Sequence, residues 1–410
     1  MSAPRAESER TYDAVVVGAG PAGSACAVLL ARRGFRVLAL DRAVFPRDKA
    51  CGEYTSPQTE RVLDRIGALE AVEAAGARRL TSMRVISPAG SSFTMEYGSP
   101  QSGEMQVLAT RRRLLDAALV DYARRCGAEV RERVKVERVT LQGGKAGGVV
   151  YRDGKNTKEV RARLVIGADG VHSAVVRSLG VGAPLRWPQN MGLVAHYAGY
   201  NGLDDWGEMH VSGAGYAGLA PQSGGVVNIG LVVPMSQADR YAGGGAAERF
   251  ERIALSFPGV RDRLAGAERV TDVRGVGPIG ARVKRTSGPG WLLVGDAAGF
   301  FDPFTGEGVH KALRGAELAI EVAADALERD DLSGRTLARY SRLRGKEFTA
   351  KDMVCRLVQV FVGLPPAMDY VVSRLGKRAH PRQVLTGVLG DYGDPHAALS
   401  PLYLWSLLRP

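Results

Sequence analysis

Cysteine is scarce in this chain of 410 residues, and long apolar runs are missing. The four cysteines, Cys26, Cys51, Cys126 and Cys355, stand far apart, and none belongs to a CxxC pair. A disulfide framework, a zinc site or a redox pair is therefore not expected, and we predict no bound metal. No stretch approaches about 18 consecutive apolar residues, and the N-terminus is polar, so neither a transmembrane helix nor a signal peptide is predicted. We expect a soluble, cytoplasmic protein.

Lysine is scarce as well, because only 10 of the 55 basic residues are lysines and 45 are arginines. The formal net charge is +12, yet the basic residues are scattered and their clusters are short, as at Arg111–Arg113. Such a surface favours anionic partners, including phosphates and acidic lipid head groups. Because no nucleic-acid-binding motif occurs, we predict no nucleic-acid partner.

Glycine, in contrast, is abundant, with 52 of 410 residues, or about 13%, against ~7% in average proteins. No strict glycine period occurs, so the excess should lie in turns and in loops that approach a ligand. The length predicts two or three domains. The apolar fraction of 45% and the charged fraction of 24% are ordinary for a globular protein and exclude a disordered chain.

The first glycine cluster, Gly18-Ala-Gly20-Pro-Ala-Gly23, matches the pattern GxGxxG. It follows an apolar run typical of a strand buried on both faces, and it precedes an alanine-rich helical segment. Asp41 ends the next apolar strand, 18 residues after Gly23. We predict this strand, helix and strand at residues 12–17, 21–33 and 36–40. The arrangement predicts a βαβ unit that holds a pyrophosphate at the helix N-terminus and ribose hydroxyls at Asp41.

Two further literal matches to GxGxxG occur, at Gly213–Gly218 and Gly275–Gly280. Neither is followed by a helical run, and prolines lie soon after both. The pattern needs a strand before it and a helix after it to indicate a dinucleotide site. We therefore predict that both matches are loop or strand.

Two glycine–acid pairs follow later in the chain, each after a buried-strand pattern: Asp169-Gly170 and Gly295-Asp296. A glycine-rich turn, Pro303–Gly308, comes shortly after the second pair. These motifs, in this order and at this wide spacing after the first glycine loop, resemble the FAD-binding fold of the para-hydroxybenzoate hydroxylase superfamily. The resemblance covers roughly residues 12–330 and implies FAD as the cofactor.

The resemblance also implies which residues hold FAD. The first loop would hold the pyrophosphate, with Asp169 close to it, and Asp296 would hold the ribityl chain. The glycine turn would place backbone N–H groups near the flavin ring. An arginine at the head of the helix over 111–126 would reach FAD, and Arg111 fits best, with Arg112 as the alternative. The complete expected set is Gly18, Gly20, Ala22, Gly23, Asp41, Arg42, Cys51, Arg111, Asp169, Asp296, Pro303, Gly306, Gly308 and Val309.

Within the superfamily, three runs are most similar to geranylgeranyl reductases. Lys49–Glu53 looks like the Cys-Gly signature beside the flavin ring, and Pro303–Gly308 is very like the flavin turn. Gly215–Pro221 aligns with the Tyr-x-Trp-x-Phe-Pro substrate motif, which makes Tyr216, Gly218, Ala220 and Pro221 the expected substrate residues. The paired-tryptophan motif and the catalytic lysine of the related flavin-dependent halogenases are missing, so halogenation is not expected.

The substrate motif departs from the family at two positions. Gly218 stands where the family has tryptophan, and Ala220 stands where it has phenylalanine. Each lost aromatic ring removes roughly 100 Å² or more of apolar surface from a pocket wall. Either the substrate is bulkier than an isoprenoid chain, or another side chain fills the space.

Cys51, Glu53 and His310 are the expected catalytic residues. Cys51 is either a small packed residue or a residue facing the flavin, whereas Glu53 and His310 are candidate proton donors. The favoured chemistry is reduction of a C=C bond in a lipophilic small molecule, and the alternative is monooxygenation of a secondary metabolite. A flavin-retaining binding protein is a third class. Because no second dinucleotide loop is predicted, NAD(P)H or another reductant should dock only transiently.

The predicted fold class is α/β with an α+β substrate part. A Rossmann-like FAD-binding domain is expected over residues 1–80, 106–181 and 276–330. An antiparallel-sheet substrate-binding domain is expected over 81–105 and 182–275, followed by a C-terminal helical region over 331–410. The tail at 402–408 is apolar, and we favour packing against the helices at 333–375 over contact with a membrane or the substrate. The oligomeric state is not predicted.

Overall fold

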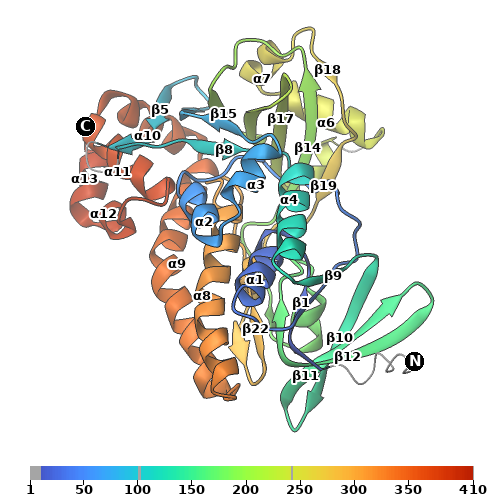
Figure 1. The fold of residues 1–410 in the computed structure, drawn as a ribbon. Helices are drawn as coiled ribbons and strands as arrows, with labels where there is room; N and C mark the ends of the chain where they lie inside the picture. The colour runs from blue at the N-terminus through green and yellow to red at the C-terminus, as the bar shows by residue number, and fades with distance from the viewer. Residues whose placement is uncertain (1–10, 100–102, 242, 410) are drawn as a thin grey trace.

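The computed structural model describes residues 11–99, 103–241 and 243–409. Two large sheets lie one above the other in Figure 1, and long helices run alongside the lower one. The last helices of the chain cluster beside the upper sheet, close to β5. This confirms the predicted class, which combines a Rossmann-like part, an antiparallel sheet and C-terminal helices.

The lower sheet contains the predicted βαβ unit. Its strands follow the order β10-β11-β12-β1-β2-β9. The strand β22 pairs with the end of β12, on the edge of β12 that is opposite β1. The pairs β1–β2, β1–β12, β2–β9 and β12–β22 are parallel. The bounds are β1 Thr11–Val17, β2 Val37–Leu40, β9 Glu129–Arg131, β10 Val134–Gln142, β11 Lys145–Asp153, β12 Asn156–Gly167, β21 Ser287–Gly288 and β22 Trp291–Leu293. The continuous apolar runs of β1, β2 and β22 reflect burial on both faces of the sheet.

Helices cover one face of this sheet and share a core with it. The helix α1 Pro21–Ala31 packs between α4 Arg112–Arg125 and α8 Gly308–Glu328. Alanines dominate α1, and this lets the neighbouring backbones approach closely, with Ala25, Cys26 and Ala27 fully buried. The short helices are α2 Gln58–Ile66, α3 Leu69–Ala74 and α5 Ala174–Ser178, and η3 spans Gly295–Ala298. The cofactor motifs therefore lie where strands end and helices begin.

The upper sheet joins strands that are far apart in the sequence. Its order is β18-β14-β17-β16-β15-β4-β5, with β19 paired to β14. The bounds are β4 Ser82–Ile86, β5 Ser92–Glu96, β14 Asn190–Ala198, β15 Trp206–Ser212, β16 Gly215–Gln222, β17 Val226–Pro234, β18 Glu268–Arg269 and β19 Arg274–Val276. The helices α6 Ala246–Ala254 and α7 Pro258–Arg263 cover one face, where Phe250 and Phe257 are buried. Both later GxGxxG matches fall on strands and loops, as predicted.

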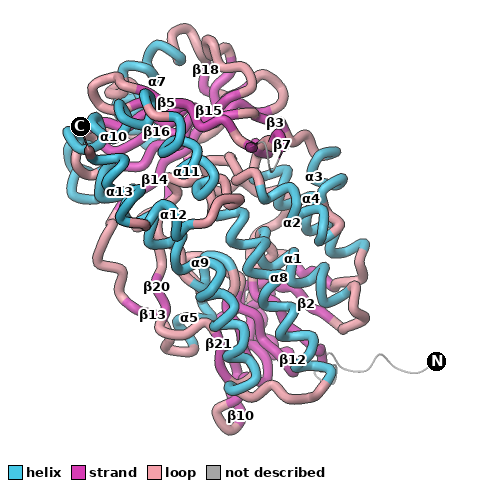
Figure 2. The backbone as a smooth tube through the Cα atoms, turned by 90° about the vertical axis from the view of Figure 1, so that its left-hand side faces the viewer, coloured by secondary structure: helices cyan, strands magenta, loops and turns pink. Residues whose placement is uncertain are grey.

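The C-terminal helices cover the other face of the upper sheet at its β5 end, as Figures 1 and 2 both show. They are α10 Pro365–Lys377, α11 Ala379–Leu389, α12 Pro395–Leu399 and α13 Pro401–Leu408. Residues of α10 and α11 share one apolar core with Val85 and Phe93 of the sheet. The preceding helix, α9 Gly334–Val362, runs alongside α8, and its C-terminal part joins the same apolar core. The tail packs in part, because Leu407 is buried and Tyr403 donates to the carbonyl of Pro381 at 3.1 Å. Leu402 and Trp405 remain 81% and 62% exposed.

Short elements complete the described chain. They are β3 Arg78–Leu80 with β8 Val107–Ala109, β6 Gly98–Ser99 with β7 Gly103–Glu104, β13 Gly182–Ala183 with β20 Arg282–Val283, and η2 Met235–Tyr241. None of the helices in the described ranges combines the length and the apolar character needed to cross a membrane.

Candidate cofactor and substrate site

A cavity of about 620 Å³ connects the two sheets and the C-terminal helices. At one end it is lined by the glycine loop and by charged side chains, including Asp41, Arg112 and Asp296. At the other end its walls are apolar side chains of the upper sheet and of α9, α10 and α11. The motifs that the sequence singled out therefore meet in a single continuous space.

Glycine occupies each of the three positions of the first loop for a different physical reason. Gly18 has a φ of +96°, and a Cβ atom there would lie 2.5 Å from the carbonyl oxygen of Ala168. A Cβ on Gly23 would lie 1.8 Å from the carbonyl oxygen of Gly18. Gly20 instead faces the cavity, and its nearest neighbour would be Arg47 Nη2 at 3.5 Å. The first and third glycines thus shape the loop, whereas the second leaves a flat surface for a ligand.

Asp41 lies at the end of β2 and lines the cavity. Its Oδ2 accepts a hydrogen bond from the backbone N–H of Ala19 at 2.7 Å, and its Oδ1 accepts from the N–H of Ala43 at 2.8 Å. These bonds fix the carboxylate beside the glycine loop. Because a carboxylate has about four acceptor positions, capacity remains for ligand hydroxyls.

Asp169 also lines the cavity, in the loop between β12 and α5. Its Oδ2 accepts from the N–H of Ala174 at 2.6 Å and from that of Val175 at 3.4 Å. Its Oδ1 is buried and has no hydrogen-bond partner among the described residues. Burial raises the pKa of this carboxyl group. Unpaired buried polar atoms are uncommon, so this oxygen is one feature that fits a bound ligand.

Cationic side chains gather around the same end of the cavity. Arg112 donates to both oxygens of Asp116, at 2.9 and 2.8 Å, and Arg47 Nη2 contacts the same carboxylate at 2.9 Å. Arg47 Nη1 is buried without a partner in the described part of the chain. Lys49 Nζ lies 3.8 Å from Asp296 Oδ2. Charged donors beside a glycine loop and a helix N-terminus suit a pyrophosphate.

The two arginines at the head of α4 differ in position. Arg112 lines the cavity, and its side chain is almost completely buried, whereas Arg111 is not among the lining residues. The sequence favours Arg111, so the structure shifts this assignment by one residue. One residue along a helix rotates the side chain by about 100°, which separates the two directions. Together, the loop, the carboxylates and Arg47 with Arg112 fit FAD.

The Cys-Gly segment closes the cavity above the upper sheet. Cys51 lines the cavity, and its carbonyl oxygen accepts from Asn228 Nδ2 at 2.8 Å. Glu53 does not line it and has a φ of +54°. Its buried carboxylate accepts from the N–H of Arg112 at 2.7 Å and lies 2.7 Å from His196 Nε2. Glu53 therefore holds the head of α4 in place, which differs from the proton-donor role that the sequence suggests.

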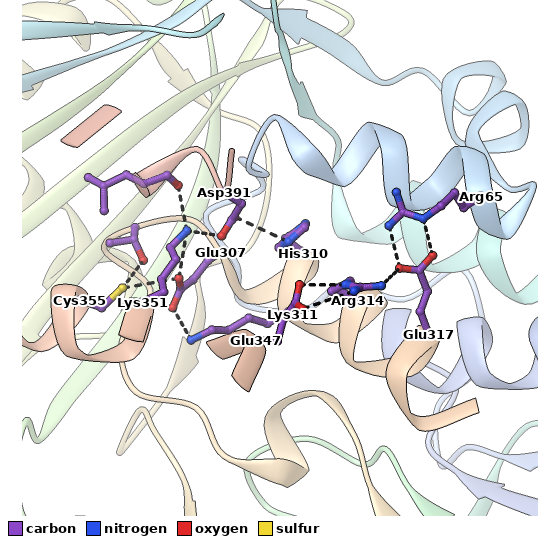
Figure 3. Close-up of polar contacts among 12 residues, drawn as sticks. Arg65, Glu307, His310, Lys311, Arg314, Glu317, Glu347, Lys351, Cys355 and Asp391 are labelled. Carbon is purple, nitrogen blue, oxygen red and sulfur yellow. Dashed lines mark hydrogen bonds and ion pairs between the residues drawn. The ribbon is translucent and has the colours of Figure 1, made fainter. Parts of the chain in front are cut away.

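The glycine turn lines the cavity with Pro303, Gly306, Gly308 and Val309. His310, the next residue of α8, is buried but does not line the cavity. Figure 3 shows that His310 points toward Asp391, and the distance from Nε2 to Asp391 Oδ2 is 4.0 Å. Burial lowers the pKa of His310. The expected proton donor is thus turned away from the flavin side, and we do not retain His310 as a catalytic residue.

A buried charge cluster lies behind this turn (Figure 3). Lys351 of α9 contacts Asp391, the carbonyl of Leu389 at 3.1 Å and Glu307 Oε2 at 3.4 Å. Lys311 donates to Glu307 Oε1 at 2.6 Å and also pairs with Asp352. Burial opposes the charge of Lys351, but Asp391 and Glu307 hold its pKa above its usual range. The cluster ties the turn to the C-terminal helices.

The segment over Tyr216–Pro221 lies within β16. The expected substrate residues Tyr216, Gly218 and Ala220 line the cavity, as does Leu219, whereas Pro221 does not. The φ of Gly218 lies outside the left-handed region, and a Cβ there would meet only Met209, at 3.4 Å from Cε. Its backbone therefore does not require glycine, and the missing side chain leaves space.

The sequence did not single out Asp302, which lies behind Tyr216. The Tyr216 hydroxyl donates to Asp302 Oδ1 at 2.5 Å, and Asn190 Nδ2 donates to Oδ2 at 2.9 Å. Gln359 Nε2 of α9 donates to Oδ1 at 2.5 Å. Burial raises the pKa of Asp302 to about 6. The position of Asp302 just before the glycine turn was the only feature of the sequence that could have indicated its role.

Comparison with known proteins agrees with this geometry. The family described as FAD binding domain matches residues 11–252. A digeranylgeranylglycerophospholipid reductase of Methanopyrus kandleri is 35% identical, covering 82% of this chain and 83% of the relative. This chain is an FAD-dependent oxidoreductase of the geranylgeranyl reductase branch. A digeranylgeranylglycerophospholipid reductase of Methanococcoides burtonii is 30% identical to this oxidoreductase, over 81% of the chain and 79% of the relative.

Solved structures share the fold of this oxidoreductase. The flavin-dependent brominase Bmp2 superposes with a TM-score of 0.83 at 22% identity and covers 97% of this chain and 99% of its own. A geranylgeranyl bacteriochlorophyll reductase-like protein of Thermoplasma acidophilum gives 0.79 at 23% identity, covering 95% and 97%. Identities this low establish the common fold and leave the reaction to be argued from the site.

We expect Asp41→Ala to raise the dissociation constant of FAD about tenfold or more, which corresponds to ~1.4 kcal/mol. The substitution removes the acceptor for the ribose hydroxyls and also releases the N–H groups of Ala19 and Ala43. Equilibrium titration of the apoprotein with FAD measures the change. Asp64→Ala, which alters an exposed carboxylate of α2 that does not line the cavity, is the matched control. An unchanged constant for Asp41→Ala would show that the carboxylate does not contact the cofactor.

Proposed function

We propose that this oxidoreductase reduces a C=C bond in an apolar chain. The observation that carries the proposal is the composition of the cavity beyond the glycine turn. Its walls there are aliphatic, sulfur-containing and aromatic side chains, and the charged lining residues belong to the cofactor end. An apolar wall accepts hydrocarbon, whereas a buried charge on the substrate would lack a partner. The relatives are named as reductases of a geranylgeranyl lipid, which supports the same reaction.

When bound, FAD supplies the hydride for such a reduction. The chain's own residues would orient the apolar substrate, exclude water and supply the proton for the second carbon. Cys51 is the proton-bearing lining residue that we assign to this step. Tyr216 is assigned to orienting the substrate, because its hydroxyl donates to Asp302 and burial raises its pKa well above its usual value. Glu53 acts as a positioning residue through Arg112 and His196.

The electron donor is part of the proposal. We assign this role to NAD(P)H, or to another reductant, docking transiently. Neither of the two later GxGxxG matches opens a helix in the described chain, so no second βαβ dinucleotide unit accompanies them. We also propose a cytoplasmic location and a lipophilic substrate.

The mass of the product tests the reaction. The purified, FAD-loaded protein is reduced with dithionite under nitrogen and incubated with geranylgeranyl lipids, and the products are analysed by mass spectrometry. We expect the substrate to gain two hydrogen atoms for each bond reduced. Heat-inactivated protein with the same reductant is the control. A product that gains one oxygen atom in air, with no reduced product under nitrogen, would replace this proposal with the monooxygenase alternative.

A further inference from the structure

Four separate parts of the structure meet at the carboxylate of Asp302, which is only 4% exposed. Its Oδ1 accepts from the Tyr216 hydroxyl and from Gln359 Nε2, both at 2.5 Å, and from the N–H of Phe304 at 3.0 Å. Its Oδ2 accepts from Asn190 Nδ2 at 2.9 Å. These donors belong to β16, α9, the glycine turn and the start of β14. We call these five residues the Asp302 network.

The chemistry of the Asp302 network requires a carboxylate at its centre. The four partners named above are neutral donors, and an ionised carboxylate has about four acceptor positions and no proton of its own. An amide at this position would turn its NH₂ group toward one of these donors and leave that donor without an acceptor. A buried polar network in which each member has a partner holds its side chains in one arrangement. Asp302 therefore fixes the positions of the groups that donate to it.

The segment that begins at Asp302 reaches both ends of the cavity. Gly306 and Gly308 line the cavity in the turn that we assign to the flavin. Phe304, in the same turn, packs edge-on against the ring of Tyr216, with the ring centroids 5.0 Å apart. Tyr216 lines the cavity from β16, which is the expected substrate wall. One short segment thus contacts the substrate wall and also forms the cofactor turn.

The centre of the Asp302 network lies outside the cavity. Asp302, Gln359 and Asn190 are buried, and none of the three lines the cavity. A ligand in the cavity therefore meets the ends of the network, at the glycine turn and at Tyr216, but does not meet its centre. A substitution at Gln359 or Asn190 that changes ligand binding must act through the positions of these ends.

We propose that Asp302 is a positioning residue that couples the binding of FAD to the binding of the substrate. The glycine turn places Asp302 when it holds FAD, and Asp302 then holds the Tyr216 ring in the orientation that contacts the substrate. Gln359 and Asn190 support the carboxylate from behind. Because a coupling free energy is reciprocal, the substrate tightens FAD binding by the same factor by which FAD tightens substrate binding. This inference rests on the proposed function and adds how its two binding sites depend on each other.

A thermodynamic cycle measures this coupling. The probe is geranylgeraniol, and its dissociation constant is determined for the apoprotein and for the FAD-loaded protein without reductant. The ratio of the two constants is the coupling factor, which we expect to be about fivefold or more. The dissociation constant of FAD, measured with and without saturating probe, should change by the same factor.

Gln359→Met is the decisive variant, because it removes one donor to Asp302 at a position that does not line the cavity. We expect the coupling factor to fall by about threefold or more, since a hydrogen bond to a buried charge is lost. Asn190→Leu should have the same effect from β14. Thr349→Val, at an exposed position of α9, is the control and should keep the full factor.

Tyr216→Phe tests the substrate end of the Asp302 network. It keeps the ring that lines the cavity and removes only the hydroxyl that donates to Asp302. The coupling factor should fall as in Gln359→Met, while the affinity of the apoprotein for the probe stays nearly the same. Tyr197→Phe is the matched control, because the Tyr197 ring belongs to the apolar cluster on the α6 and α7 side of the sheet.

The release of FAD provides a second measurement for variants whose apoprotein does not stay folded. Loaded protein is diluted, and the rate of FAD release is followed by flavin fluorescence with and without the probe. The probe should slow release in the natural protein and much less in Gln359→Met. Equal coupling factors and equal slowing in the natural protein, Gln359→Met and Tyr216→Phe would refute this inference alone, as would a natural factor of one. If the natural loaded protein does not bind the probe, the proposed function fails together with the inference.

Discussion

Gly23→Ala should leave almost no folded protein that contains FAD. The added Cβ would lie 1.8 Å from the carbonyl oxygen of Gly18 and 2.9 Å from its carbonyl carbon. Both are backbone atoms of the loop that shapes the cofactor site, so neither can move without displacing β1 or α1. Soluble yield, circular dichroism and the flavin absorbance of the purified fraction measure the effect.

Two other glycines separate this effect from a general intolerance of alanine. Gly213→Ala, in a later GxGxxG match, should change nothing, because no atom lies within 4 Å of the new Cβ and its φ is unstrained. Gly20→Ala should fold but retain less FAD, because its Cβ would enter the space for the pyrophosphate. A Gly23→Ala variant with normal yield and full flavin absorbance would show that the loop in solution differs from this structure.

Lys351→Met should lower the free energy of unfolding by about 3–5 kcal/mol, the usual range when one partner of a buried ion pair is removed. The Lys351 side chain is 7% exposed, and its loss leaves Asp391 and Glu307 short of a counter-charge. Because Glu307 belongs to the glycine turn, FAD retention should fall as well. Chemical denaturation and FAD titration measure the two effects.

Lys346→Met on the same helix is the matched control, since this lysine is exposed. It should change stability by no more than about 0.5 kcal/mol. Equal stabilities for the two variants would mean that the buried cluster is not a structural tie. Loss of stability with unchanged FAD affinity would show that the buried cluster stabilises the C-terminal helices but does not support FAD binding at the glycine turn.

The parts of the fold that the sequence predicted are those with local signals. A continuous apolar run, a glycine turn and an alanine-rich helix follow one another over Thr11–Ala31, and each is visible without knowledge of the rest of the chain. The same holds for the glycine–acid pairs after β12 and β22. The upper sheet was predicted from alternating runs, but the pairing of β4 with β15 joins residues more than a hundred positions apart and has no local signal.

Some residues lie elsewhere than the sequence suggested, because their positions depend on the rotation of a helix about its axis and on contacts between distant parts of the chain. Arg111 and Arg112 are equivalent in the sequence, and only the packing of α4 decides which one reaches the cavity. His310 lies in the first turn of α8, as predicted, but the sequence does not indicate that it lies near Asp391 and outside the cavity lining, because Asp391 is distant in the sequence. The sequence predicted a C-terminal helical region over 331–410 without indicating that residues of α10 and α11 would form the cavity wall.

The sheet order has a consequence for synthesis of the protein. Although the glycine loop lies near the start of the chain, β22 joins β12 only after residue 293, and the turn that completes the cofactor site follows at residues 303–308. The wall formed by α10 and α11 is added later still. A chain emerging from the ribosome would therefore expose the apolar face of the upper sheet until nearly all of it had been made. Capture of FAD should be a late, post-translational step, and truncation near residue 360 should give an aggregating product with an incomplete cavity.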